Sequence, residues 1–172
     1  MGIGGQQLTI VVDVANVMGS RPDGWWRDRA GAAVRLHAEI VRLARSGRAI
    51  LPASPAPASP APASPAPASP APDELRPAPG FVMVLEGAAW AAAARLAATE
   101  PDVEAGRTGP VRPGEVRVVQ ARGSGDDTIV AVVRELPGRR VVVTADRELR
   151  ARCVAAGAEI LGPGWLLGLL GG

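Results

Sequence analysis

The sequence has neither lysine nor tyrosine, and it contains one cysteine and one histidine among 172 residues. Without lysine the chain cannot form a P-loop, in which a lysine side chain binds the phosphates of a nucleotide. The lone cysteine, Cys153, excludes an internal disulfide and is typical of a protein from a reducing compartment. The lone histidine, His37, falls in a segment of helical periodicity with no candidate nucleophile beside it, which argues against a catalytic triad.

Long apolar runs are also absent. A membrane-spanning helix needs about 20 consecutive apolar residues, and the C-terminal segment GWLLGLL is shorter and is interrupted by Gly168. The N-terminal segment MGIGGQQLTIVV has no positively charged region and no cleavage site of the kind found in signal peptides. We therefore expect a cytoplasmic protein without a membrane span.

The positive charge of the chain comes from arginine alone. The sequence has 19 basic and 17 acidic residues, which gives a net charge of +2 at pH 7. Arginine is in excess over residues 1–51 and 116–172, whereas residues 81–115 are net acidic. A basic rim of this kind is compatible with nucleic-acid binding but does not require it.

Residues 53–72 form a low-complexity segment, ASPAPASPAPASPAPASPAP, with a five-residue repeat. The segment has no charged and no large apolar side chain, so it cannot contribute to a core. Proline at this density favours polyproline II and is incompatible with helix or sheet. Because a long surface insertion costs little closure entropy, we interpret residues 52–79 as a disordered insertion in a single domain that spans residues 1–172.

The rest of the chain alternates short apolar segments, rich in β-branched residues, with longer amphipathic ones. The first kind predicts strands and the second kind predicts helices. The expected strands are residues 8–14, 81–86, 116–120 and 139–145, with a short fifth at 158–161. The expected helices are residues 29–47, 88–98, 126–136 and 146–157. This alternation indicates an α/β fold, a three-layer α/β/α sandwich with a mostly parallel sheet of four to five strands.

Acidic residues follow each of the first four predicted strands. Asp13 ends the first and Glu86 the second, while Asp126 and Asp127 follow the third and Asp146 follows the fourth. Because the carboxyl ends of parallel strands lie at one edge of a sheet, we expect these carboxylates to lie close together. Crowded carboxylates repel one another unless a cation lies between them, and oxygen ligands suit Mg²⁺ or Mn²⁺. The sequence therefore predicts a metal site at this edge, with Glu86 as its weakest member.

Helix capping is the alternative explanation for some of these residues. An aspartate at a helix start commonly accepts hydrogen bonds from free backbone N–H groups. Capping accounts for Asp127 or Asp146 taken singly, but we expect it to explain neither Asp13 nor Asn16 three residues later. The turn at 123–125 is of the glycine-rich kind that binds phosphate at a helix N-terminus. With carboxylates at that position, we interpret the helix N-terminus as a support for the metal site.

Three segments resemble the NYN domains of the PIN-like nuclease superfamily: VVDVANVMGS (11–20), GSGDD (123–127) and VVVTADREL (141–149). The shared pattern is an apolar strand ending in D-x-x-N, a G-x-x-D helix start, and an apolar strand ending in [ST]-x-D. The segment GSRPDGWWRDRAGAA (19–33) resembles a bacterial, actinobacterial branch of that group. The resemblance covers nearly the whole chain outside residues 52–79. It implies a PIN-like sandwich and metal-dependent phosphodiester hydrolysis, usually of RNA.

The resemblance also implies roles for individual residues. Asp13, Asp126 and Asp146 would be the catalytic metal ligands, with Asp127 as the competitor of Asp126. Asn16 would orient Asp13 or contact the substrate.

Many PIN-like proteins have a further acid in the helix after the first strand. Here that helix offers only Glu39, so Glu86 is the candidate substitute.

Other residues near the predicted edge are candidates for substrate binding. They are Ser124, Arg21, Arg122, Arg147 and Trp25. Arginines position a nucleic-acid backbone, although for each one taken singly we favour solvated surface as the explanation. Trp25 and Trp26 either stack on unpaired bases or pack loop 19–28 against the sheet, and we favour packing with one ring in and one ring out. We expect Asp28 to cap the helix that follows.

Three classes of function are compatible with these features. The first is a metal-dependent endoribonuclease that acts on single-stranded RNA. The second is a nucleoside-triphosphate pyrophosphohydrolase that uses the same metal site, although the helical E-x-x-E motifs usual in such enzymes are absent. The third is an inactive PIN-like domain that binds RNA or protein. We expect RNA as the partner, and a homodimer or a ribosomal or RNA-processing partner is compatible with the sequence.

Overall fold

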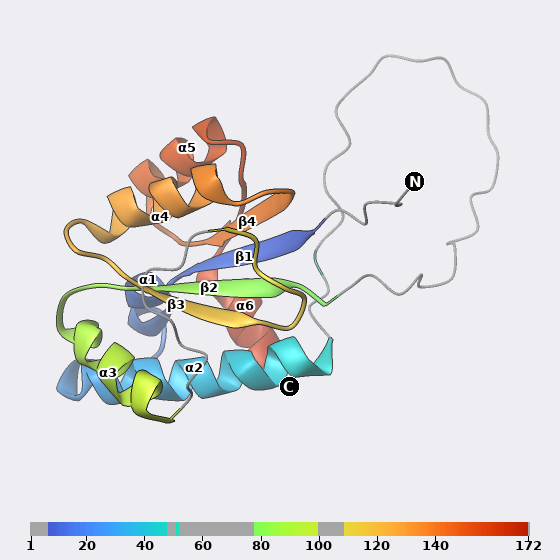
Figure 1. Cartoon of the computed structure of the whole chain (residues 1–172). Helices are drawn as coiled ribbons and strands as arrows, with labels where there is room; N and C mark the ends of the chain where they lie inside the picture. Colours follow the sequence, from blue (N-terminus) through green and yellow to red (C-terminus); the bar gives the residue numbers. More distant parts are fainter. Residues whose placement is uncertain (1–6, 48–50, 52–77, 100–108, 172) are drawn as a thin grey trace, which may run out of the picture.

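The computed structural model describes residues 7–47, 51, 78–99 and 109–171, which form a five-stranded sheet with helices on both faces (Figure 1). Neighbouring strands all pair in parallel, in the order β3-β2-β1-β4-β5. The strands are β1 (Leu8–Asp13), β2 (Gly80–Leu85), β3 (Val116–Gln120), β4 (Arg139–Val143) and β5 (Glu159–Leu161). The predicted α/β/α sandwich is confirmed, as is the short fifth strand.

β1 lies at the centre of the sheet, and its side chains alternate between two hydrophobic cores. Ile10 and Val12 belong to the first core, on one face of the sheet, and Val11 belongs to the second core, on the other face. All three side chains are fully buried. The alternation follows from the two-residue period of a strand, and apolar residues on both faces are typical of a parallel sheet covered by helices. Asp13 is in register with Val84 of β2, so the carboxyl ends of these strands lie side by side.

Two sets of helices cover the two faces of the sheet (Figure 1). One face carries α1 (Val14–Gly19), α2 (Arg29–Ser46), α3 (Trp90–Thr99) and α6 (Pro163–Leu170), and the other carries α4 (Gly125–Glu135) and α5 (Arg147–Ala155). Leu36 and Ile40 of α2 pack into the first core, and Ile129 and Val133 of α4 pack into the second. Their four-residue spacing places each pair on one face of its helix, as the periodicity predicts.

The sequence does not predict α1 and α6. α1 has six residues and begins directly after β1, which is too short for a periodic pattern. In α6, Leu166 is fully buried and Trp165 packs against the first core, so the C-terminal apolar segment packs on the sheet as a helix. No helix in the described part of the chain is long and apolar enough to span a membrane.

Two 3₁₀ turns precede longer helices, and most of the predicted insertion lies outside the described residues. The turns are η1 (Trp25–Arg27) before α2 and η2 (Gly87–Ala89) before α3. The insertion predicted at residues 52–79 lies outside the described residues except for Ala78 and Pro79, which lead into β2. The predictions of an insertion and of a single domain therefore stay predictions.

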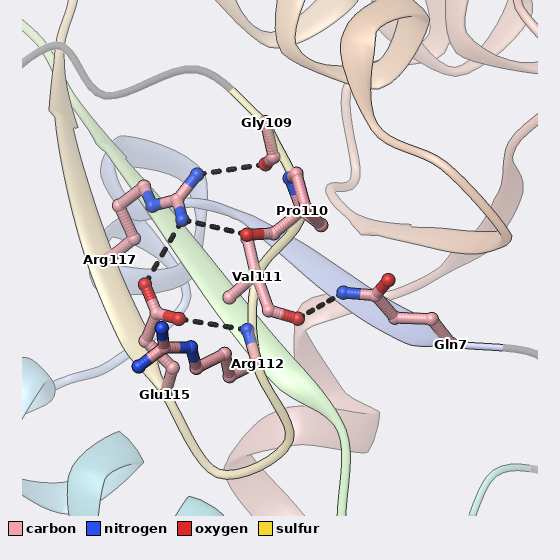
Figure 2. A network of polar contacts seen from close by, with 7 residues as sticks. All are labelled: Gln7, Gly109, Pro110, Val111, Arg112, Glu115 and Arg117. Atoms are coloured by element: carbon pink, nitrogen blue, oxygen red, sulfur yellow. Dashed lines mark hydrogen bonds and ion pairs between the residues drawn. The ribbon is translucent and has the colours of Figure 1, made fainter.

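Arg117 of β3 forms hydrogen bonds with the segment that leads into this strand (Figure 2). Its buried guanidinium donates hydrogen bonds to the carbonyl oxygens of Gly109 and Pro110, both at 3.0 Å, and to the carboxylate of Glu115 at 3.1 Å. Glu115 also accepts a hydrogen bond from the backbone N–H of Arg112 at 2.8 Å. A buried arginine thereby satisfies carbonyl groups that belong to no regular element.

Candidate active site

A cleft of about 460 Å³ lies at the carboxyl edge of the sheet. It is lined by Asp13, Ala15, Asn16, Gly19, Ser20, Glu86, Asp126 and Asp146. Its four carboxylates come from four segments, one after each of the first four strands. The structure thus brings five of the predicted site residues together, at the edge where parallel strands deliver their carboxyl ends.

Asp13 is both the last residue of β1 and the N-cap of α1. Its carboxylate is buried, and both of its oxygens accept hydrogen bonds. Oδ1 accepts from the backbone N–H of Asn16 at 3.1 Å, and Oδ2 accepts from the hydroxyl of Thr144 at 2.9 Å. The expectation that capping does not explain Asp13 is therefore wrong, because the apolar run of residues 8–14 continues into a helix that the pattern conceals.

Asn16 and Thr144 connect the end of β1 to the end of β4. The side-chain oxygen of Asn16 accepts a hydrogen bond from the backbone N–H of Ala145 at 2.9 Å. The hydroxyl of Thr144, which is fully buried, donates to Asp13 and accepts from the backbone N–H of Asp146 at 3.1 Å. These bonds fix the position of Asp13 relative to the segment that carries Asp146.

Glu86 occupies the N-terminus of α4, where a glycine-rich turn would bind a phosphate. Its Oε2 accepts a hydrogen bond from the backbone N–H of Gly125 at 2.9 Å. A Cβ atom at position 125 would lie 2.0 Å from this oxygen, so a larger residue there would force the Glu86 side chain to move away from the N–H. The turn therefore makes room for a carboxylate of the protein itself, and the helix N-terminus stabilises its negative charge.

Burial, together with neighbouring negative charges, raises the pKa of two carboxyl groups of the cleft. Burial raises the pKa of Asp126, and the negative charges of Asp146 and Glu86 raise it further. Burial also raises the pKa of Asp13, with smaller contributions from Glu86 and Asp126, although the hydrogen bonds that Asp13 accepts act in the opposite direction. Both groups are therefore weaker acids than a free aspartate side chain, as expected where burial and neighbouring negative charges disfavour ionisation.

Each of three carboxylates is directed to a different helix N-terminus. Asp13 caps α1, Glu86 binds the N–H at the start of α4, and Asp146 caps α5 by accepting from the backbone N–H of Leu149 at 2.8 Å. Capping is therefore confirmed for Asp146, which lines the cleft as well. One oxygen of each side chain is already engaged with backbone.

The donor set of the cleft is chemically suited to a hard divalent cation. Carboxylate oxygens are the ligands of Mg²⁺ and Mn²⁺, and four negative charges in one cleft are what such an ion neutralises. In the described part of the chain, no group of three or more Asp, Glu, His or Cys side chains is arranged to hold a metal ion. The ligand chemistry fits a divalent cation, while three of the four carboxylates are each engaged at the N-terminus of a different helix.

Asp127 lies outside the cleft. Its exposed carboxylate pairs with Arg152 of α5 at 2.5 Å. The N-cap of α4 is Ser124, whose hydroxyl accepts a hydrogen bond from the backbone N–H of Asp127 at 3.4 Å. Successive helix residues point about 100° apart, which separates Asp127 from Asp126. Only Asp126 of this pair lines the cleft.

The arginines expected to position substrate do not line the cleft. Arg21 pairs with Glu39 of α2, with 2.5 Å between Nη2 and Oε2. Arg122 and Arg147 are exposed. Glu39, the acid considered for the helix after the first strand, is likewise outside the cleft.

Trp25 packs against the first core, whereas Trp26 is exposed. The two rings meet edge to face with 6.3 Å between their centroids, and the guanidinium of Arg29 lies 5.3 Å from the Trp25 centroid. The expected arrangement of one ring in and one ring out is confirmed. Asp28 caps α2 as predicted, accepting from the backbone N–H of Gly31 at 2.8 Å.

Sequence reasoning missed two polar residues at the site. Thr144 was part of the T-x-D motif without an assigned role, and a polar residue that ends an apolar strand was the available signal. Ser20 lines the cleft and donates a hydrogen bond to the carbonyl oxygen of Asn16 at 2.9 Å. No sequence signal distinguishes Ser20 from an ordinary loop residue.

Comparisons of the chain with models of protein families, with curated proteins and with solved structures gave no match. The resemblance to NYN domains therefore stays a hypothesis based on the three motifs.

Proposed function

We propose that this chain is a metal-dependent endoribonuclease that cleaves single-stranded RNA, with Asp13, Asp126 and Asp146 as metal ligands and Glu86 beside them. The observation that carries the proposal is the convergence of carboxylates from four successive strand ends on one cleft. The raised pKa values of Asp13 and Asp126 support it: burial is the largest cause and neighbouring negative charges add to it, and a bound cation offsets both by stabilising the ionised carboxylates.

The three motifs that suggest an NYN domain also support the proposal. Asp13 and Asn16 of the first motif, Asp126 of the second and Asp146 of the third come from distant parts of the sequence, yet all line the same cleft. The cytoplasmic location belongs to the proposal too, because the lone cysteine of the chain suits a reducing compartment.

The three proposed metal ligands differ in how firmly hydrogen bonds hold their side chains in place. Mg²⁺ or Mn²⁺, when bound, supplies a water of lowered pKa and neutralises charge on the scissile phosphate. Asp13 is the fixed ligand, because it is buried and both of its oxygens are held by hydrogen bonds. Asp126 makes no hydrogen bond to another described residue, so its side chain is free to turn toward the ion. Asp146 keeps its second oxygen for the same purpose.

The test is cleavage of an end-labelled single-stranded RNA in the presence of Mn²⁺, Mg²⁺ or EDTA. We compare the wild type with Asp13→Asn, Asp126→Asn and Asp127→Asn. Metal-dependent cleavage is expected, lost in the first two variants and retained in the third. Asp127 is the matched control, because it is the same residue type in the same helical turn but lies outside the cleft.

Other outcomes assign the site differently. Failure to cleave RNA, together with no Mn²⁺ binding by calorimetry, overturns the proposal. Release of pyrophosphate from a nucleoside triphosphate without RNA cleavage supports the pyrophosphohydrolase. Binding of RNA that needs neither metal nor the aspartates, without cleavage, supports an inactive RNA-binding domain.

A further inference from the structure

Two tryptophan side chains are exposed on segments that lead away from the cleft. Among the described residues, the exposed large hydrophobic side chains are Trp26 (57 %), Trp90 (46 %) and Val154 (58 %). Building on the proposed function, we infer that Trp26 and Trp90 stack on unpaired bases of the RNA strand whose backbone enters the cleft. Stacking of bases on aromatic rings is the usual way in which proteins bind single strands.

Trp26 is held beside one wall of the cleft. Gly19 and Ser20 line the cleft, and a Cβ atom at Gly19 would lie 3.8 Å from the ring of Trp25. Trp25 packs against the first core and contacts Trp26 edge to face. The half-buried ring thus supports the exposed one, so stacking on Trp26 requires little ordering of the side chain.

Trp90 lies at the same edge of the sheet. It follows the cleft residue Glu86 after the single turn η2. Its carbonyl oxygen accepts a hydrogen bond at 3.4 Å from the side chain of Gln120, the last residue of β3. Since η1 and η2 both contact α2, the two tryptophans belong to the same layer of the sandwich.

The loop of Trp26 carries exposed guanidinium groups as well as two acids. The two acids of its loop are engaged with backbone: Asp23 accepts from the N–H of Trp25 at 3.1 Å, and Asp28 caps α2. Arg27 and Arg29 remain exposed on either side of Asp28. The loop therefore presents an aromatic ring and guanidinium groups, the combination that binds bases and phosphates of a single strand.

A protein partner would require a different surface. Protein-binding sites contain a contiguous apolar core surrounded by polar residues. The third exposed apolar side chain, Val154, is on α5 and thus on the other face of the sheet. The exposed apolar side chains of the described residues are therefore divided between the two faces, and the two near the cleft are both aromatic.

The test is fluorescence anisotropy with a labelled oligouridylate, measured in EDTA so that hydrolysis does not interfere. Trp26→Ala and Trp90→Ala are each expected to weaken binding by about 5- to 150-fold, and Trp26→Phe and Trp90→Phe to restore most of it. Val154→Ala is the matched control, because it removes an equally exposed apolar side chain away from the cleft. Thermal unfolding of each variant checks that the fold is retained.

A second measurement separates this inference from the proposed function. Metal-dependent hydrolysis of bis(p-nitrophenyl) phosphate, which has no nucleotide chain to extend from the cleft, is expected to be unchanged in the two alanine variants while KM for RNA rises. Unchanged RNA affinity in both variants overturns the stacking inference even if RNA is cleaved. Weakened RNA binding in a protein that hydrolyses no phosphodiester upholds the stacking sites and overturns the nuclease proposal alone.

Discussion

The carboxylate of Glu86 and the backbone nitrogen of Gly125 are 2.9 Å apart, and this contact joins the end of β2 to the start of α4. A glycine-rich turn before a helix usually indicates a site for an external anion. Here the anion is a side chain of the protein, and glycine leaves room for it, because a Cβ atom would lie 2.0 Å from the carboxylate oxygen in its present position.

Gly125→Ala is expected to lower the free energy of unfolding by about 1–3 kcal/mol, because the new methyl group displaces Glu86 and breaks the hydrogen bond between its carboxylate and the backbone N–H of residue 125. In a Glu86→Ala background the same substitution is expected to be neutral or to stabilise by up to about 1 kcal/mol, since alanine is the better helix residue. Urea denaturation of the four proteins measures both values.

Gly123→Ala is the control for this cycle, because a Cβ atom at position 123 meets nothing within 4 Å. It is expected to change stability by less than about 0.5 kcal/mol. Equal destabilisation by Gly125→Ala in both backgrounds would show that Glu86 is not the group that requires the glycine.

Thr144→Val is expected to lower the free energy of unfolding by about 1–3 kcal/mol, because it removes the hydroxyl that donates to the buried carboxylate of Asp13. The same hydrogen bond lowers the pKa of Asp13, so its loss raises that pKa. If Asp13 acts in its ionised form, the acidic limb of the pH–rate profile moves to higher pH.

Thr144→Ser keeps the hydroxyl and is expected to retain both the stability and the pH profile more closely than valine does. A pH profile that is unchanged in Thr144→Val, with activity reduced at every pH, would mean that the hydroxyl does not control the ionisation of Asp13.

The position of the site could be predicted from the sequence because it depends on topology. Parallel strands end at one edge, so an acid after each apolar segment leads to one cleft, as it does for Asp13, Glu86, Asp126 and Asp146. The orientation of single side chains could not be predicted in this way. The role of Glu86 depends on a contact with residue 125, and no local pattern links positions 39 residues apart.

The other wrong predictions concern residues at the point where a helix begins. A strand that passes directly into α1 has no break in its apolar pattern, so the capping role of Asp13 was hidden. The choice between Asp126 and Asp127 depends on which direction each residue takes from α4, and this requires the helix to be placed on the sheet.

Arg117→Met is expected to lower the free energy of unfolding by about 1–3 kcal/mol, because two carbonyl groups and Glu115 lose their buried donor. Arg112→Met is the control: only the backbone of Arg112 contacts Glu115 and its side chain is exposed, so a change below about 0.5 kcal/mol is expected. The comparison is made by urea denaturation. A similar loss in both variants would contradict the structural role of Arg117.

The stability of the metal-free protein is expected to depend on the carboxylates of the cleft. The folded protein raises the pKa of Asp13 and Asp126 above 3.8, so each binds a proton more tightly than in the unfolded chain. Their stabilising contribution is fully present below pH 3.8 and is lost as the pH rises through their folded pKa values. The free energy of unfolding of Asp126→Asn, relative to the wild type in EDTA, should therefore increase as the pH is raised through this range.

At neutral pH, Mn²⁺ is expected to stabilise the wild type more than Asp126→Asn, which is opposite to the difference expected in EDTA. A cation that binds the ionised carboxylates stabilises the folded wild type by mass action, whereas Asp126→Asn has lost a ligand and gains less. Potassium chloride at matched ionic strength is the control for screening, which weakens repulsion among exposed charges in any protein. If Mn²⁺ and potassium chloride raise the unfolding midpoint of the wild type equally, the carboxylates of the cleft do not bind the metal as ligands. In that case the three helix N-termini alone compensate for the repulsion among these carboxylates.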